Sequence, residues 1–167
     1  MQAHVVWRKV HGWLSMIVAI PLLVIIATGL LLQVKKDFPW IQPTEERGGG
    51  GAPHVSFADV LATCAAQEEL NVRGWEDIRR VDLRPDKALL KVTTQCGREV
   101  QIDPADGRVL RVAYRRSDVI EALHDGSWFG SVAKRFVFLP TAIALLVLWS
   151  TGIYLFFLPH LRTRKQS

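Results

Sequence analysis

The sequence predicts a membrane protein in which a hairpin of two transmembrane helices carries an inserted small α+β domain. Residues 11–34 are apolar apart from His11, Ser15, Thr28 and Gln33, and residues 136–158 contain no charge. A helix needs about 20 apolar residues to cross a hydrocarbon core of about 30 Å, and both blocks are long enough. Between them the pattern changes from helical to alternating, which is typical of one helix packed on an antiparallel sheet.

We expect the following segments: a cytoplasmic tail 1–10, a first transmembrane helix 11–36, a Pro/Gly-rich linker 37–54, the α+β domain 55–113, a short helix and re-entry segment 114–134, a second transmembrane helix 135–158 and a basic tail 159–167. The basic flanking residues favour cytoplasmic termini and place residues 37–134 outside a bacterial inner membrane. The first apolar block exceeds the h-region of a signal peptide, so we expect it to be retained.

The net charge of +5 is unevenly distributed along the chain. Residues 37–130 contain all 16 acidic residues and 12 of the 21 Lys and Arg, which gives this region a net charge of −4. The other nine basic residues flank the apolar blocks: Arg8, Lys9, Lys35, Lys36, Lys134, Arg135, Arg162, Arg164 and Lys165. This distribution suits lipid headgroups and lacks the positive face that nucleic-acid binding requires. The expected partners are the bilayer and a second copy or another membrane protein.

Residue types predict the structure of the segment before the domain and of the first helix in the domain. Three prolines and four consecutive glycines at 48–51 predict a flexible tether that follows an anchor at Trp40. Ser56 and Asp59 form a capping-box pattern, which predicts a helix over residues 56–70. The apolar residues at i, i+3, i+4 and i+7 should lie on a sheet: Phe57, Val60, Leu61 and Cys64.

Turn residues then divide the rest of the domain into about four short strands. The turns RPDK, QCGR and DPADG, at 84–87, 95–98 and 103–107, separate runs of alternating pattern. Such spacing predicts an antiparallel meander. We expect Ala88, Leu90 and Val92 to share one face of the sheet, and Val100 and Ile102 to share one face in the same way.

Three sequence motifs resemble a known family. Residues 55–113 end in DPADGRV at 103–109, the Asp-Pro-x-x-Gly-x-Val hallmark of PepSY domains. HGWL at 11–14 leads to ATGL at 27–30, and LHDG at 123–126 leads to STGI at 150–153, which is similar to the PepSY-associated transmembrane family. Larger members of that family have more crossings and are linked to siderophore-iron reduction through haem. Other PepSY domains are inhibitory modules in protease propeptides.

The resemblance implies two functions of different classes. The first is an accessory component of a membrane redox or iron (siderophore) handling assembly that binds haem b. The second is a cofactor-free extracytoplasmic interaction module, such as a protease-regulating or complex-assembly subunit. We find no Ser/His/Asp nucleophile motif, HExxH, phosphate loop or dinucleotide fingerprint, so a stand-alone enzyme is not expected.

The candidate cofactor ligands are His11, His124 and His160. In an antiparallel hairpin, His11 lies near His160 and the Thr-Gly pair 151–152, whereas His124 lies beside the Thr-Gly pair 28–29. Haem b in a helical bundle needs axial imidazoles and room for a flat macrocycle. His11 and His124 are a membrane thickness apart, so a bis-histidine site needs His11 with His160, or residues from a second copy or a partner. Histidines that face headgroups or cap helix ends are the commoner alternative.

The two cysteines, Cys64 and Cys96, both fall in the predicted domain. In an oxidising compartment they could form a disulfide, and two buried free thiols fit equally well. Neither a CxxC motif nor Cys/His metal spacing is present in the sequence, so no metal site is expected.

Overall fold

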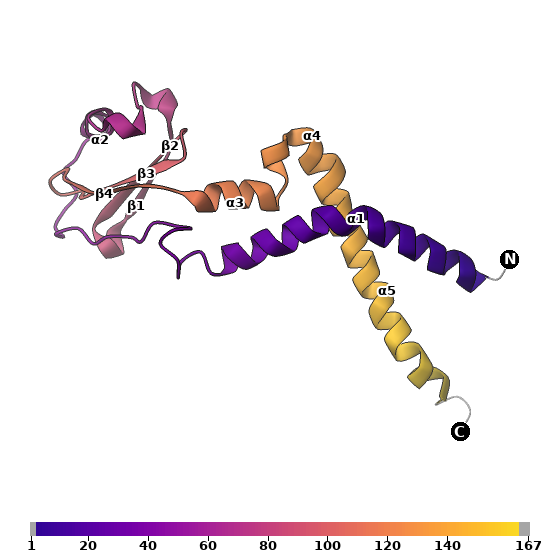
Figure 1. The fold of residues 1–167 in the computed structure, drawn as a ribbon. Helices are drawn as coiled ribbons and strands as arrows, with labels where there is room; N and C mark the ends of the chain where they lie inside the picture. The colour runs from indigo at the N-terminus through magenta and orange to yellow at the C-terminus, as the bar shows by residue number, and fades with distance from the viewer. Residues whose placement is uncertain (1–2, 164–167) are drawn as a thin grey trace. The chain divides into compact units, whose positions relative to one another are not determined.

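The structure is a computed structural model that describes the backbone of residues 3–163 and the side chains of residues 12, 13 and 15–153. The described residues form two compact units (Figure 1). The helical unit comprises the residues up to Leu30 and from Glu121 onward, and the α+β unit comprises Leu31–Ile120. The division falls within two helices that continue from one unit into the other.

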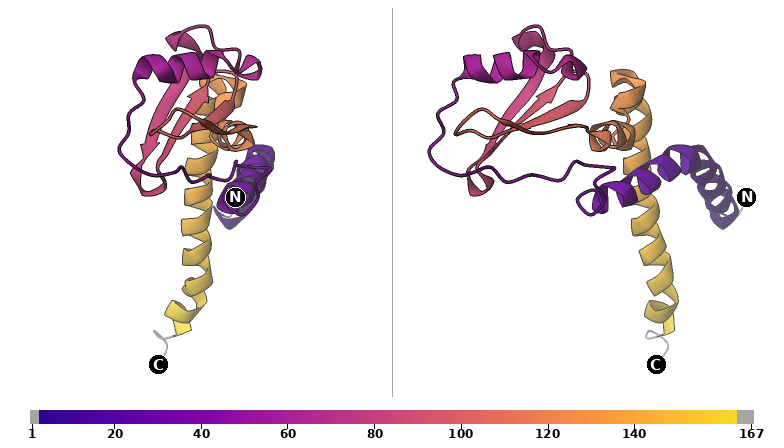
Figure 2. Two further views of the ribbon diagram at one scale, coloured as in Figure 1. Left: turned by 90° about the vertical axis from the view of Figure 1, so that its left-hand side faces the viewer. Right: turned by 60° about the vertical axis from the view of Figure 1, so that its left-hand side comes forward.

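Two long apolar helices dominate the helical unit. Helix α1 spans Ala3–Gln33 and α5 spans Leu139–Thr163. The apolar stretches Ser15–Gln33 and Ser131–Ile153 have 19 and 23 residues and mean hydropathies of 2.6 and 2.0, so each is long enough to cross a bilayer. Pro21 lies inside α1, which is bent along its length (Figure 2). The pair confirms the two predicted apolar helices, and their hairpin arrangement stays a prediction.

Short helical segments connect the α+β unit to α5. Helix α3, Arg116–His124, is followed by the 3-10 turn η4, Ser127–Phe129, and by α4, Ser131–Ala133. The π-helical turn η5, Lys134–Phe138, then continues into α5. The second apolar stretch therefore starts at Ser131. A π turn in a long helix often marks a functional position.

A four-stranded antiparallel sheet confirms the predicted meander. The strands are β1 Ile78–Arg84, β2 Leu89–Thr94, β3 Arg98–Ile102 and β4 Val109–Tyr114, in the order β1-β2-β3-β4. Val92 lies opposite Val81 on β1 and opposite Val100 on β3. The expected position of Ala88 is wrong: it has φ 47° and caps the 3-10 turn η3, Pro85–Lys87, so it precedes β2.

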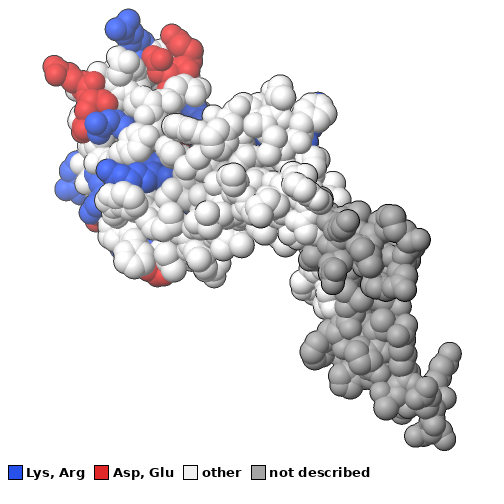
Figure 3. Space-filling model, turned by 45° about the vertical axis from the view of Figure 1, so that its right-hand side comes forward, with Lys and Arg blue, Asp and Glu red and all other residues white. Residues whose placement is uncertain are grey.

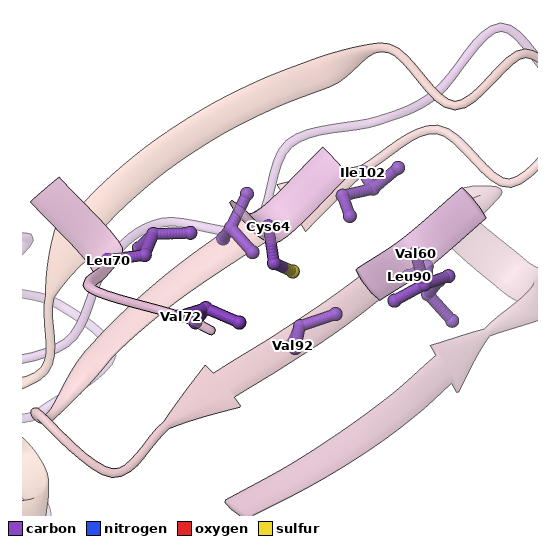
Figure 4. Close-up of a cluster of buried hydrophobic side chains, with 8 residues drawn as sticks. Val60, Cys64, Leu70, Val72, Leu90, Val92 and Ile102 are labelled. Carbon is purple, nitrogen blue, oxygen red and sulfur yellow. The ribbon is translucent and has the colours of Figure 1, made fainter. Parts of the chain in front are cut away.

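Helix α2, Phe57–Ala65, packs on one face of this sheet (Figure 4). The Ser56 and Asp59 capping box forms as predicted. The helix is shorter than predicted, because it ends at Ala65 and the 3-10 turn η1, Glu68–Leu70, follows. Phe57 is wrong as a core residue, since 70% of it is exposed. The core cluster consists of Val60, Cys64, Leu70, Val72, Leu90, Val92, Val100 and Ile102.

The opposite face of the sheet is covered by residues 41–49, which we call the strap. Gln101 in β3 accepts a hydrogen bond from Glu46 N at 2.8 Å and donates one to Thr44 O at 3.0 Å. Gly48 N donates to Lys87 O at 3.0 Å. The strap has no helix or strand, but it is bound to the sheet and differs from the flexible tether that its composition predicts. Buried polar groups on β2 and β3 need partners, and the strap supplies them.

Candidate functional site

His124, at the end of α3, contacts α1 within the helical unit. Its Nδ1 lies 3.1 Å from Thr28 Oγ1 and 3.1 Å from the carbonyl oxygen of Ile25. The Thr28 hydroxyl donates to Val24 O at 2.6 Å, which leaves Thr28 Oγ1 as an acceptor toward the ring. Both neighbours of Nδ1 therefore accept, so Nδ1 carries a proton. In the neutral ring the lone pair is then on Nε2, the nitrogen that would ligate a metal.

Gly29 provides the space in which the imidazole lies. A Cβ added at Gly29 would be 3.3 Å from His124 Cε1. The prediction that His124 lies beside the Thr-Gly pair 28–29 is confirmed. The imidazole itself fills this notch, so any flat ligand must approach from the Nε2 edge of the ring.

Asp125 stabilises the turn that follows His124. Its carboxylate accepts a hydrogen bond from Ser127 N at 2.9 Å and pairs with Lys134 at the start of η5. These hydrogen bonds, from Lys134 first and then from Ser127, lower the pKa of Asp125 to about 2. The turn is therefore tied to the first residues of the second apolar helix.

Gly126 brings the same turn close to η5. It has φ 79°, and a Cβ at this position would lie closer than 3.0 Å to the ring of Phe138. Phe138 is buried and stacks on Phe129 with ring centroids 5.9 Å apart. Sequence reasoning missed this packing. The glycines in the HDGSWFG run were its signal, since glycine is the residue that tolerates positive φ.

The side chains of the other two candidate ligands, His11 and His160, are outside the described residues. His11 lies in α1 and His160 lies in α5. The Thr-Gly pair 151–152 repeats part of the first notch, because Thr151 Oγ1 donates to Val147 O at 2.8 Å. A Cβ added at Gly152 would meet no atom within 4 Å among the described residues. His124 is therefore the one candidate ligand whose surroundings the described side chains define.

In the α+β unit, the DPADG motif has a structural role. Asp103 accepts hydrogen bonds from Ala105 N at 2.9 Å and from Gly49 N of the strap at 2.6 Å. These bonds, from Gly49 first, lower the pKa of Asp103. Gly107 closes the turn with φ 76° and donates to the Asp103 carbonyl oxygen at 2.9 Å. The motif therefore fixes the β3–β4 turn and the end of the strap together.

A charged network lies between the strap and the sheet. Glu99, whose side chain is 1% exposed, is 2.5 Å from Arg115 and 3.4 Å from Lys91. Lys91 also pairs with Glu45 of the strap at 3.0 Å, and Glu45 pairs with Lys87 at 2.6 Å. The charged side chains on the face shown in Figure 3 gather on the α+β unit. Sequence reasoning found none of these pairs, because each joins residues of two different segments of the chain.

The strap should loosen in acid. The hydrogen bonds from Lys87 and Lys91 lower the pKa of Glu45 from 4.5 to about 2, against the opposing effect of its burial. This contribution to stability is complete above pH 4.5 and is lost as the pH falls through about 2. We expect the free energy of unfolding of the α+β unit to decrease over this range in urea titrations of the full chain. The Glu45→Gln variant should depend less on pH, and an unchanged pH profile would contradict this role.

An apolar groove of about 250 Å³ lies between α2 and the edge strand β1. Its lining residues are Pro53, Val55, Phe57, Val60, Val81, Leu83, Leu90 and Pro104. The exposed ring of Phe57 packs edge-on against Trp75 with centroids 6.0 Å apart. The groove accounts for the exposure of Phe57, because this side chain lies at its rim.

Both cysteines are free thiols in the structure. Cys64 is buried in the core, and this burial raises its pKa to about 11. Cys96 is exposed in the β2–β3 turn, where its Sγ donates to Leu70 O at 3.3 Å. Among the described residues, no group of three or more His, Cys, Asp or Glu side chains could hold a metal ion.

The comparison with protein families settles which family this is. A family described as PepSY-associated TM region matches residues 8–167, nearly the whole chain. The chain belongs to the PepSY-associated TM region family. Membership confirms the resemblance to the PepSY-associated transmembrane family that the HGWL and LHDG motifs carry, and together with the two apolar helices it indicates a membrane protein. No curated protein and no solved structure matches the chain.

Proposed function

We propose that this member of the PepSY-associated family is an accessory component of a membrane redox or iron (siderophore) handling assembly, and that His124 ligates haem b. It would be a two-pass protein of a bacterial inner membrane, with cytoplasmic termini and residues 37–134, including a PepSY domain, outside. The observation that carries the haem proposal is the His124 ring, whose Nδ1 faces the acceptors Ile25 O and Thr28 Oγ1.

The surroundings of His124 suit an axial ligand. Metal-ligating histidines commonly donate the second ring N–H to a carbonyl or another acceptor, which fixes the tautomer and strengthens the ligating nitrogen. Ile25 O and Thr28 Oγ1 would play that part, with Nε2 as the ligand atom. Haem b would supply one-electron transfer when bound. The second axial ligand is proposed to come from a second copy or from a partner protein, because His11 and His160 are expected at the opposite face of the membrane.

Optical spectroscopy of protein purified from haem-replete cells tests this proposal. We expect a Soret band that His124→Ala strongly reduces, because a ligand is lost. Thr28→Val should keep the band and raise the midpoint potential, because a weaker acceptor at Nδ1 makes Nε2 a poorer donor to the oxidised iron. His54→Ala, in the exposed segment before α2, is the matched control. Folded wild-type protein without a Soret band would overturn the haem assignment.

The apolar groove beside β1 favours a second candidate function. A cofactor-free module outside the membrane, which regulates a protease or assembles a complex, would need a surface of this kind for a partner. The groove lies in the α+β unit, apart from His124, so this function requires no haem. The spectroscopic experiment separates the two candidates, since only the first requires a Soret band.

A further inference from the structure

Arg116 stacks over two aromatic rings at one end of the α+β unit. Its guanidinium carbon lies 4.9 Å from the ring centroid of Trp40 and 5.7 Å from that of Tyr114. Arg116 Nη1 also donates to Trp40 O at 3.2 Å. Trp40 is 63% exposed and Tyr114 is 39% exposed. A planar cation held between aromatic faces keeps its N–H groups available at the edge of the plane.

This stack lies close in sequence to the end of the first apolar stretch. The stretch ends at Gln33, and the last turn of α1 belongs to the same compact unit as the stack. Two successive turns follow, in which Asp37 N donates to Val34 O at 3.0 Å and Ile41 N donates to Phe38 O at 2.9 Å. These turns shorten the path from the hydrocarbon edge to Trp40. Tryptophan that follows the end of a membrane-spanning helix is typical of the headgroup layer.

The strap entry and the start of α3 are held together, which fixes the stack. Ser117 N donates to Ile41 O at 2.8 Å, and both residues are buried. The segment that leaves α1 and the segment that begins α3 therefore meet beside Trp40 and Arg116. Backbone hydrogen bonds hold the two chain segments that carry Trp40 and Arg116, so the stack has a fixed position in the α+β unit.

Three cations, in the stack and in the segment after α1, form no ion pair within the part of the chain that the structure describes. Arg116, Lys35 and Lys36 take part in none of the ion pairs found among the described residues, whereas Arg115 pairs with Glu99 and Asp118. Asp37 is the single acidic residue between Gln33 and Trp40. Arg116 and the two lysines that follow α1 therefore carry positive charge that no ion pair of the described residues neutralises, in the same unit as the exposed aromatic rings, and such charge attracts anionic lipid.

We propose that Arg116, Trp40 and Tyr114, with Lys35 and Lys36, form a docking surface for the phosphate groups of anionic phospholipids. The guanidinium edge and the two ammonium groups bind phosphate oxygens, and the indole and phenol rings occupy the headgroup layer. Docking holds the α+β unit against the bilayer. This interaction needs no haem and is independent of the function proposed above.

The test uses the full chain in nanodiscs of phosphatidylcholine alone or with 30% phosphatidylglycerol, read by hydrogen exchange of residues 34–42 and 113–118. We expect slower exchange of both segments in the anionic discs. Arg116→Gln should abolish most of this difference, and Lys35→Gln with Lys36→Gln should weaken it without touching the stack. Each removed charge should lower the affinity for the anionic surface about fivefold.

Arg84→Gln is the matched control, because it removes an exposed arginine from β1 and should leave the lipid effect unchanged. Inorganic phosphate added to phosphatidylcholine discs should give no protection. Equal exchange of wild-type protein in both kinds of disc, or equal protection by free phosphate, would overturn the proposal. So would an unchanged lipid effect in both the Arg116→Gln variant and the double lysine variant.

Discussion

The Glu99→Ala variant is expected to lower the free energy of unfolding of the α+β unit by about 3–5 kcal/mol, because it leaves buried cations without their partner. Glu99 Oε2 is 2.5 Å from Arg115 and 3.4 Å from Lys91, and Glu99 Oε1 accepts from Gln101 at 2.7 Å. Lys91 and Arg115 are largely buried, so water would replace the lost carboxylate poorly. Native-state hydrogen exchange of β2 and β3 amides in the detergent-purified full chain measures the loss.

Two further variants distinguish the effect of losing the Glu99 charge on stability from the effect of losing its side-chain volume. Glu99→Gln keeps the volume and should also destabilise, since the amide adds donors where Arg115 and Lys91 already donate. Glu68→Ala removes an exposed carboxylate and should change stability by less than about 0.5 kcal/mol. If Glu99→Ala behaved like Glu68→Ala, the network would contribute nothing measurable to the stability of the unit.

Local signals in the sequence were sufficient for most of the α+β unit. The Ser56 capping box and the three turns depend on residues within a few positions of each other, and the structure contains them. The strap was not predictable in this way. Its binding depends on pairs such as Glu45 with Lys91, which are 46 positions apart, whereas its glycines and prolines suggest mobility. Phe57 follows the helical apolar pattern, yet it borders a groove.

The sequence predicted where the His124 side chain lies, but it did not predict the hydrogen bonds that the ring makes. The repeated His and Thr-Gly order placed His124 beside Thr28, and the structure agrees. The protonation of Nδ1 could not be predicted, because it depends on the Ile25 carbonyl and on the hydroxyl direction of Thr28. A backbone carbonyl that accepts a hydrogen bond cannot be recognised from the pattern of residue types in the sequence. The same holds for Gly126, whose importance comes from the packing of Phe138.

The Gly126→Ala variant is expected to open the re-entry turn and to destabilise it by about 2–4 kcal/mol. An alanine at φ 79° costs about 1–2 kcal/mol, and its Cβ would lie closer than 3.0 Å to the buried Phe138 ring, so that ring must move. Hydrogen exchange of residues 121–138 should therefore become markedly faster. Phe138→Leu in the same chain should restore part of the protection, because the smaller side chain leaves room for the methyl group. Gly152→Ala, whose added Cβ meets no atom of the described residues within 4 Å, is the control, and equal effects of the two glycine substitutions would contradict the steric argument.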